Sequence, residues 1–433
     1  MLRAGNETSP GMKHRPERLN VFHAEDRPMV TLTDIQAAAG LLEGKVIRTP
    51  LVHSPTFSAI TGAEVYLKLE CMQKAGSFKV RGATCRILLQ RDEIGPGGVI
   101  AASAGNHAQG VAVAASMAGV PATIVMPTWV SLAKQEATIG YGARVILAGE
   151  SLEESIGFAQ QFAMEQGLSF IHPYDDPMVI AGQGTIGLEI LSDLPDVECV
   201  VVPIGGGGLI AGIATALTAS QRKIRVLGVQ AEACPSAREA LRAGQAVTVE
   251  ARPTIADGIR VKRTGELSFP IIQKLVDEVV LVDEEAIVNA VLALLERKKV
   301  LAEGAGAAPL AALLSGGIRV SRGEKVAVVI SGGNMDAFLL ERVLKKGLYT
   351  GGRMVQIRVV LEEGRGSLPA LLDIIAKQGA VVSQIFQERS VPGLPVHQMR
   401  VTLELEVRDL PHRKGLIAAM RSAGYPVEAF PED

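Results

Sequence analysis

The sequence is poor in cysteine, aromatic residues and net charge, and each shortage excludes a class of protein. The four cysteines form no C-x-x-C pair and the seven histidines are scattered, which argues against a zinc site and favours a reducing, cytoplasmic compartment. Aromatic residues make up 4% of the chain and the net charge is -2, so neither nucleic acid nor a membrane surface is an expected partner. Residues 199–221 carry no charge, but Pro203 and four glycines interrupt them, which argues against a membrane span.

The length of the chain leaves room for more than one domain. With 433 residues, of which 48% are hydrophobic and 21% charged, it can build two or three substantial cores. Residues 1–30 are polar and lack the apolar stretch of a secretory signal, and we expect them to be disordered. We place a large domain at 31–345, a linker at 346–354 and a smaller domain at 355–433.

Short apolar runs alternate with helical patterns through the large domain. Strands that are apolar throughout and alternate with helices predict an α/β fold with a parallel sheet covered on both faces. Ligands bind beyond the carboxyl ends of the strands in such sheets. The expected strands are 98–102, 121–127, 143–147, 199–204, 225–230 and 326–330.

The last part of the chain has a different pattern. Residues 355–359 and 399–407 alternate between apolar and polar side chains, which predicts strands. Apolar residues from Leu368 to Ile375 have helical spacing, and Gly379 ends that helix. With the short helix and strand that close the chain, the order βαββαβ predicts a ferredoxin-like unit, one sheet face of which is covered by helices.

Residues 75–83 place a lysine between small and apolar neighbours, with glycines near both ends. Partial desolvation of Lys79 would lower the pKa of its amine and so favour the neutral, nucleophilic form. Such an amine forms a Schiff base with an aldehyde. The alternative is a lysine whose stem lies along apolar surface at a helix start. Two further segments favour the first interpretation.

One of these segments is a run of glycines that follows an apolar strand and begins a helix. The loop comprises Gly205, Gly206, Gly207, Gly208 and Leu209. Glycines let the backbone approach an anion, and a helix start presents N–H groups to it, so we interpret the loop as a phosphate site. A tight structural turn is the alternative. The G-x-G-x-x-G pattern at 182–187 follows no strand, and we reject it as a dinucleotide fingerprint.

The other segment follows a second strand and contains polar side chains suited to small ligands. Asn106 offers an amide for a ring hydroxyl, while Ser103, Gly105 and His107 can donate hydrogen bonds to a small carboxylate. A capping or core histidine is the alternative for His107. Ser331 ends another buried strand, where its hydroxyl can meet a ring nitrogen or simply belong to a turn.

Together these residues supply a Schiff-base lysine, a phosphate loop, an amide and a hydroxyl, which are the groups that pyridoxal phosphate requires. In sequence and order the segments closely resemble the threonine dehydratase (threonine ammonia-lyase) family over residues 31–345. They are 77–83 (SFKVRGA), 103–110 (SAGNHAQG), 205–209 (GGGGL), 254–258 (TIADG) and 331–334 (SGGN).

The resemblance implies a fold and an activity. The expected fold is the tryptophan-synthase-β-like one, fold type II of the pyridoxal-phosphate enzymes, with a catalytic domain of two parallel-sheet subdomains. The expected reaction converts L-threonine to 2-oxobutanoate and ammonia, with L-serine as a further substrate. Ala104 stands where related serine racemases carry a second serine that acts on the opposite face, which argues for dehydration over racemisation.

The resemblance also implies a role for each site residue. Lys79 holds pyridoxal 5'-phosphate, with Phe78 beside it, and takes the Cα proton of the substrate. Asn106 contacts the ring hydroxyl, the glycine loop the phosphate, and Ser331 the ring nitrogen. Ser103, Asn106 and His107 hold the substrate carboxylate. A serine hydroxyl at the ring nitrogen, unlike a carboxylate, does not favour a protonated ring, which suits prompt elimination.

Two further positions stay open at this level. Related enzymes bind a cation near the cofactor, and Glu232 and Ser236 are the candidates for a monovalent ion here. Arg238 stands where a second carboxylate is expected, so we predict no divalent metal site. Glu303 begins a stretch (303–307, EGAGA) that resembles the family's cofactor surroundings, with a carboxylate at a helix N-terminus as the alternative.

The tail from 355 resembles an ACT regulatory domain, in which residues 363–368 (EGRGSL) match the ligand loop. We therefore expect an allosteric amino acid there, isoleucine or valine if the enzyme serves isoleucine biosynthesis. The alternative is that this domain only pairs subunits. The family's habits imply a homotetramer or homodimer.

Two other functions remain as alternatives. One is a different enzyme of the same fold, such as a serine or hydroxyaspartate dehydratase or a serine racemase. The other is a non-catalytic amino-acid sensor whose first domain is a relic. The intact Lys79 and glycine loop weigh against the sensor.

Overall fold

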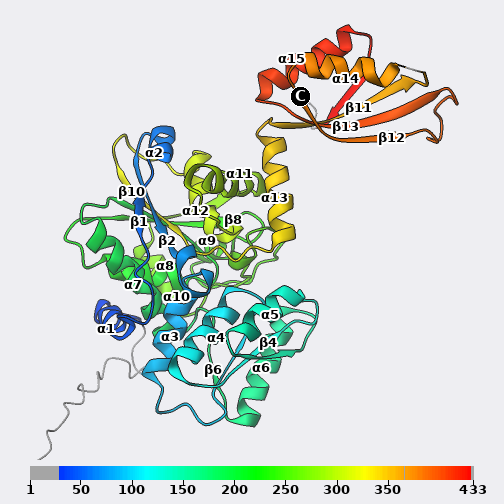
Figure 1. Cartoon of the computed structure of the whole chain (residues 1–433). Helices are drawn as coiled ribbons and strands as arrows, with labels where there is room; N and C mark the ends of the chain where they lie inside the picture. The colour runs from blue at the N-terminus through cyan, green and yellow to red at the C-terminus, as the bar shows by residue number, and fades with distance from the viewer. Residues whose placement is uncertain (1–28, 365, 431–433) are drawn as a thin grey trace, which may run out of the picture.

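The computed structural model describes residues 29–364 and 366–430, so residues 1–28 of the expected disordered extension lie outside it. The chain forms two sheets in a large N-terminal body and a third in a small C-terminal domain (Figure 1). The long helix α13 (Ala337–Thr350), yellow in Figure 1, joins the two parts. Within the described ranges, no helix is both long and apolar enough to cross a membrane.

The larger sheet has six strands, and β1 is antiparallel to β2 whereas all other neighbouring pairs are parallel. Its central strands are buried on both faces, which explains why they are apolar throughout. Across the sheet the order is β1 (Leu51–His53), β2 (Glu64–Leu69), β10 (Lys325–Ile330), β7 (Cys199–Pro203), β8 (Arg225–Ala231) and β9 (Glu278–Val282).

Helices surround this sheet on both faces. They are α1 (Leu32–Leu42), α2 (Pro55–Thr61), α7 (Pro177–Asp193), α8 (Gly208–Leu217), α9 (Ser236–Ala243), α10 (Ser268–Leu275), α11 (Glu284–Ala293) and α12 (Gly304–Leu314). The rejected fingerprint 182–187 lies inside α7, which agrees with its rejection.

A second, four-stranded parallel sheet is built from the segment between β2 and β7. Its order is β5 (Arg144–Leu147), β4 (Ala122–Met126), β3 (Val99–Ala102) and β6 (Ser169–Phe170). Its helices are α3 (Lys79–Leu89), α4 (Asn106–Ala118), α5 (Leu132–Gly140) and α6 (Leu152–Gln166). The predicted pair of parallel-sheet subdomains is confirmed.

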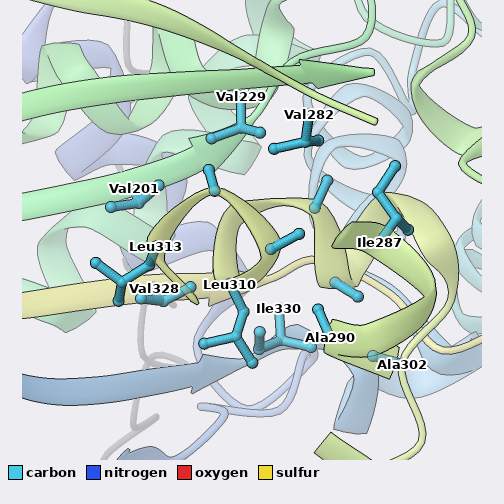
Figure 2. Packing of buried hydrophobic residues seen from close by; sticks show 14 of the residues in the cluster. Val201, Val229, Val282, Ile287, Ala290, Ala302, Leu310, Leu313, Val328 and Ile330 are labelled. Atoms are coloured by element: carbon cyan, nitrogen blue, oxygen red, sulfur yellow. The ribbon is translucent and has the colours of Figure 1, made fainter. Parts of the chain in front are cut away.

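Helix α12 lies at the centre of the larger core. All of its residues but the last are buried, as expected of a helix that is apolar on every side. Figure 2 shows Leu310 and Leu313 of α12 among Val201, Val328 and Ile330 of the strands, and α11 packs on the other side. Burying each such side chain contributes about 1.5–3 kcal/mol. This packing fixes where the first residues of α12 lie.

The C-terminal domain has the predicted βαββαβ order and an antiparallel sheet. Its elements are β11 (Met354–Glu362), α14 (Ser367–Lys377), β12 (Val381–Glu388), β13 (Gln398–Glu406), α15 (Leu410–Ser422) and β14 (Val427–Phe430), with strand order β12-β13-β11-β14. Alternate residues of β11 and β13, such as Ile357 and Leu403, are buried and form a core with α14 and α15.

The predicted linker 346–354 differs from the structure. Helix α13 continues to Thr350 and β11 begins at Met354, which leaves a turn of three residues. Gly347, which lies within the predicted linker, is buried inside the helix, and a Cβ there would lie 3.0 Å from the Leu292 side chain of α11. This glycine serves the close packing of two helices rather than chain flexibility.

Candidate active site

Lys79 is the first residue of α3, and the turn before it has unusual backbone geometry. Ala75 and Gly76 have φ angles of 59° and 69°, the left-handed region. A Cβ on Gly76 would overlap the side chain of Asn334. On the other side, a Cβ on Gly110 of α4 would lie 3.0 Å from the backbone of Lys79. Gly76 before the lysine and Gly110 on the neighbouring helix therefore let other chain segments pack closely around Lys79.

The amine of Lys79 lies in a largely desolvated place. Its Nζ donates a hydrogen bond to the carbonyl oxygen of Pro173 at 2.7 Å and lies 5.2 Å from the centre of the Phe78 ring. Burial lowers the pKa of Lys79 to about 8, although the carboxylate of Glu303 opposes the shift. A substantial fraction of the amine is therefore neutral near pH 8, as predicted for a nucleophile or base.

The glycine loop lies next to the segment that contacts Lys79. A Cβ on Gly206 would overlap the ring of Tyr174, and one on Gly208 would lie 2.6 Å from the carbonyl oxygen of the same residue. Gly207 has a φ of 99° and is the N-cap of α8, where it provides no side-chain cap. The loop therefore needs glycine for packing and leaves the first amides of α8 available to an anion.

The end of β10 crosses the start of α3. The N–H of Phe78 donates to the carbonyl oxygen of Ser331 at 3.1 Å, and Ser77 forms an antiparallel bridge with Gly332. The side chain of Ser331 is buried here, beside the segment that carries Lys79. The contact of its hydroxyl with a ring nitrogen stays a prediction.

Asn106 begins α4 and belongs to a chain of side-chain hydrogen bonds. Its Nδ2 donates to Oε1 of Glu303 at 2.6 Å, and its Oδ1 accepts from Nδ2 of Asn334 at 2.6 Å. Asn334 also donates to the carbonyl oxygen of Ala75 at 2.7 Å. The structure thus joins the lysine segment, the Asn106 segment and the end of β10 in one place.

The residues predicted to hold the substrate carboxylate flank Asn106. Ser103 follows β3, and its Oγ accepts from the N–H of Gly105 at 3.2 Å. A Cβ built on Gly105 would meet nothing within 4 Å, so there is open space beside this turn. His107 is buried with Nε2 2.9 Å from the carbonyl oxygen of Ile171. A buried contact with a backbone carbonyl is typical of a core histidine, which is the alternative interpretation given above for His107.

Burial also determines the charge of His107. It lowers the pKa of the imidazole to about 3, with a smaller contribution in the same direction from Lys79. His107 is therefore neutral at pH 7, and Nε2 is the protonated nitrogen because it faces a carbonyl oxygen. Whether this residue also meets a substrate stays a prediction.

The site fits an anionic ring compound such as the cofactor that the sequence implies. The hydroxyl of Ser77, next to Phe78, is buried and has no hydrogen-bond partner among the described residues. A buried orphan hydroxyl is costly unless another group meets it. The glycine loop, the helix start and the amine of Lys79 supply the remaining donors.

The two residues predicted to bind a monovalent cation, Glu232 and Ser236, are less well placed for binding than the residues around Lys79. The side chain of Glu232 is exposed, whereas Ser236 is buried with its Oγ 3.3 Å from Nε2 of Gln230. Over the described ranges, no three histidine, cysteine or acidic residues are grouped as metal ligands. The monovalent cation stays a prediction.

The ligand loop of the C-terminal domain is described only in part, because Arg365 lies outside the described residues. Glu363 pairs with Arg389 at 2.9 Å, and Gly366, with a φ of 105°, begins α14. Ser367 donates from Oγ to the carbonyl oxygen of Gly364 at 3.2 Å.

Sequence reasoning missed three parts of the site. The segment from His172 to Tyr174 lies between Lys79 and the glycine loop, yet it served only to reject a fingerprint. Asn334 lies in the predicted segment 331–334, but the sequence assigned it no role of its own. The role of Glu303 was left open. The missing signal is three-dimensional, since Asn106 and Glu303 are 197 positions apart in the chain.

Comparison with known proteins agrees with this geometry. The family model described as pyridoxal-phosphate dependent enzyme matches residues 42–332. The L-threonine ammonia-lyase of Thermotoga maritima is 48% identical over 399 residues, which cover 92% of this chain and 99% of the relative. That alignment is long enough to include most of the C-terminal domain as well.

Solved structures match about three quarters of this chain. The processed form of threonine deaminase isoform 2 from Solanum lycopersicum has a TM-score of 0.69 and 37% identity, covering 73% of this chain and 92% of its own. Maize serine racemase has a TM-score of 0.69 and 37% identity, with coverage of 74% and 98%. The backbone alone therefore does not distinguish elimination from racemisation.

Proposed function

The chain belongs to the pyridoxal-phosphate-dependent enzymes, and from this premise we propose that it is an L-threonine ammonia-lyase. Its cofactor is pyridoxal 5'-phosphate. The observation that carries the proposal is the convergence of Lys79, Asn106 and the glycine loop on one place, in a chain nearly half identical to a threonine ammonia-lyase along almost its whole length.

Each residue of the site has a task in this proposal. The bound cofactor supplies an aldehyde for the substrate amine and withdraws electrons from Cα. Lys79 would hold the cofactor, and its amine, when neutral, would accept the Cα proton at Nζ. The amides of the glycine loop hold the phosphate, Asn106 the ring hydroxyl and Ser331 the ring nitrogen. Ser103, Asn106 and His107 orient the substrate carboxylate.

The reaction balances as a β-elimination. Threonine loses the Cα proton to Lys79, the Cα–H electrons form the new double bond, and the hydroxyl at Cβ takes up a proton from nearby water and departs as water. The enamine that is released hydrolyses to 2-oxobutanoate and ammonia. L-serine, which lacks only the methyl group of threonine, gives pyruvate by the same route, and we propose it as a second substrate.

Ala104 favours elimination over racemisation in this proposal. Racemisation needs a second acid on the face opposite Lys79, and alanine has no proton to give. A serine or hydroxyaspartate dehydratase remains an alternative in the same fold. A non-catalytic sensor would need neither the lowered pKa of the Lys79 amine nor the buried Ser77 hydroxyl that has no hydrogen-bond partner among the described residues.

The first test is release of 2-oxobutanoate from L-threonine by the purified chain with pyridoxal 5'-phosphate. We expect turnover that falls more than about 10³-fold in Lys79→Ala, because base and cofactor attachment are lost together. Lys74→Ala is the matched control, since Lys74 lies on the preceding turn and its Nζ donates to the carbonyl oxygen of Lys45 and to Sδ of Met117, which belong to no part of the proposed site. Full turnover by Lys79→Ala contradicts the mechanism. Cofactor binding without threonine turnover points to another substrate.

We also propose that the C-terminal domain regulates this activity in response to isoleucine or valine. Helix α13 supports the idea because it begins three residues after Asn334, which bonds to Asn106. At its other end, Lys345 lies 2.8 Å from the buried carboxylate of Glu404 on β13, and the hydroxyl of Tyr349 donates to the same group.

A cavity lies at the junction of the two parts. It measures about 820 Å³ and is lined by side chains of α13 and of the C-terminal domain, among them Lys346, Thr350, Gln356 and Phe430. A ligand that changes the junction can pull or release one end of α13, and the Asn334 end lies beside the site. The proposal therefore has a physical route between effector and chemistry.

A homodimer or homotetramer is the assembly we propose. Strand β12 forms an edge of the C-terminal sheet, and all eight of its residues are exposed. Val381, Ile385 and Phe386 place apolar side chains there. Pairing of this edge with a second copy would cover both its apolar side chains and its free backbone groups.

A further inference from the structure

Glu303 is a buried carboxylate to which the proposed reaction gives no task. It occupies the N-cap position of α12, but its side chain accepts no hydrogen bond from the first turn of that helix. It turns instead toward Asn106 and is only 5% exposed. Glycine at 332 makes room for it, because a Cβ there would lie 2.6 Å from Oε1 of Glu303. The alternative of an ordinary helix-terminal carboxylate therefore does not describe this side chain.

We propose that Glu303 is a positioning residue that fixes the amide of Asn106 toward the cofactor ring. The inference rests on the proposed function, which gives Asn106 its contact with the ring hydroxyl. It concerns only how that contact is held.

The hydrogen bonds around Asn106 have one consistent direction. A carbonyl oxygen, that of Ala75, ends the chain on one side, and the carboxylate of Glu303 ends it on the other. Neither the carbonyl oxygen of Ala75 nor an ionised Glu303 carboxylate can donate a hydrogen bond. Asn334 must therefore turn its Nδ2 toward Ala75, and Asn106 must turn its Nδ2 toward Glu303. Asn334 uses both of its amide hydrogens, on Ala75 and on Oδ1 of Asn106.

One amide hydrogen of Asn106 is left over. Its Nδ2 carries two hydrogens, and Glu303 accepts one of them at 2.6 Å in a bond that is charge-assisted when the carboxylate is ionised. The other is available to an oxygen of the ring. Without Glu303 the amide of Asn106 keeps only its bond to Asn334, and rotation about its last bond becomes easier. The ring would then meet either the donor or the acceptor of the amide.

The charge of Glu303 is sensitive to its surroundings. Burial and the nearby carboxylate of Asp257 raise the pKa of Glu303 to about 7, while its hydrogen bond to Asn106 and the amines of Lys134 and Lys79 act against the shift. The thiol of Cys71, whose own pKa burial raises to about 12, is a further titratable group near Glu303. The hydrogen bond that Glu303 accepts from Asn106 is therefore strongest above neutral pH, where Glu303 is ionised.

The experiment compares Glu303→Ala, Glu303→Gln and Asn334→Ala with the wild-type holoenzyme. The readouts are the dissociation constant for pyridoxal 5'-phosphate and the visible absorption of the bound cofactor from pH 6 to pH 9. We expect Glu303→Ala and Asn334→Ala to raise the dissociation constant about tenfold and to alter the spectrum, because both loosen the same amide. Glutamine keeps an acceptor oxygen, so Glu303→Gln should recover most of the affinity while losing any spectral change near pH 7.

Asp283→Asn is the matched control, since Asp283 is the N-cap of α11, bonds to the N–H of Ala286 and lies outside the site. We expect it to bind and absorb like the wild type. Equal affinity and spectrum in Glu303→Ala and the wild type would overturn the proposal, and so would a Glu303→Gln variant as weak as Glu303→Ala. If the cofactor measurements come out as expected but threonine is not turned over, only the proposed substrate is wrong.

Discussion

The Lys79 site and the C-terminal domain are held together by different kinds of contact. The site is joined by polar side chains from distant segments, such as Asn334 with Ala75, which are 259 positions apart. The C-terminal domain is joined by alternating apolar residues on neighbouring strands and by helices packed on one face. Among its described residues, Glu404 and Arg413 are the buried polar ones.

The difference shows where each part tolerates change. A hydrogen bond depends on position within a few tenths of an ångström, whereas an apolar core accepts many side chains of similar volume. The chemistry of the site therefore depends on the identity of each polar side chain. The core of the C-terminal domain determines a fold but does not indicate which ligand the domain binds. Each of the following predictions tests one side of this contrast.

The largest effect is expected at the buried ion cluster behind Lys79. Arg81 is fully buried, and its guanidinium donates to both carboxylate oxygens of Glu70 and of Glu189. Arg81→Met leaves the buried carboxylate of Glu70 without its counter-charge, so we expect the free energy of unfolding to fall by about 3–5 kcal/mol. Urea unfolding followed by circular dichroism measures it.

The matched control for that measurement is Arg353→Ala at the junction, which removes a half-exposed pair with Glu296. We expect a change below about 1 kcal/mol there. Similar losses in both variants would show that the polar contacts of the catalytic body are no more critical than those at its edge.

A smaller effect is expected from His107 and depends on pH. The folded protein keeps His107 neutral down to a pKa of about 3, whereas the unfolded chain takes up a proton near pH 6.5. The unfolded state binds more protons in between, so stability falls as the pH falls, by about 2 kcal/mol between pH 7 and pH 5. His107→Gln should remove this contribution.

The check is urea unfolding at pH 7 and pH 5, with the exposed His397→Gln as the control. If His107→Gln loses as much stability on acidification as the wild type, the imidazole is not held neutral by burial.

The smallest effect on turnover is expected from removing the C-terminal domain. A chain that ends after Gly352 keeps all of α13 and every residue of the site. We expect threonine turnover within about threefold of the full chain, and loss of any response to isoleucine or valine, because the site's polar contacts lie within the N-terminal body. If the truncated chain still responds to isoleucine or valine, the effector site lies outside the C-terminal domain. If the truncated chain has no turnover, the N-terminal body depends on the C-terminal domain for its activity.

The sequence predicted the parts of this molecule that depend on pattern. Apolar runs located the parallel strands, alternation located the C-terminal unit, and motifs located Lys79, Asn106 and the glycine loop. The predicted linker is largely helix α13, in which Gly347 serves a helix–helix contact, and the sequence does not distinguish such a glycine from one in a loop. Contacts such as Asn106 with Glu303 depend on how two distant helix starts are placed, and no local pattern contains that information.

The continuity of α13 has a consequence for how the two parts can be rearranged. An α-helix turns about 100° per residue, so one residue inserted into α13 would swing the C-terminal domain by that angle about the helix axis and advance it by about 1.5 Å. Seven inserted residues would bring it back to nearly its first orientation, about 10 Å farther out. The phase of this helix, and not only its length, therefore sets which face of the C-terminal domain the catalytic body meets.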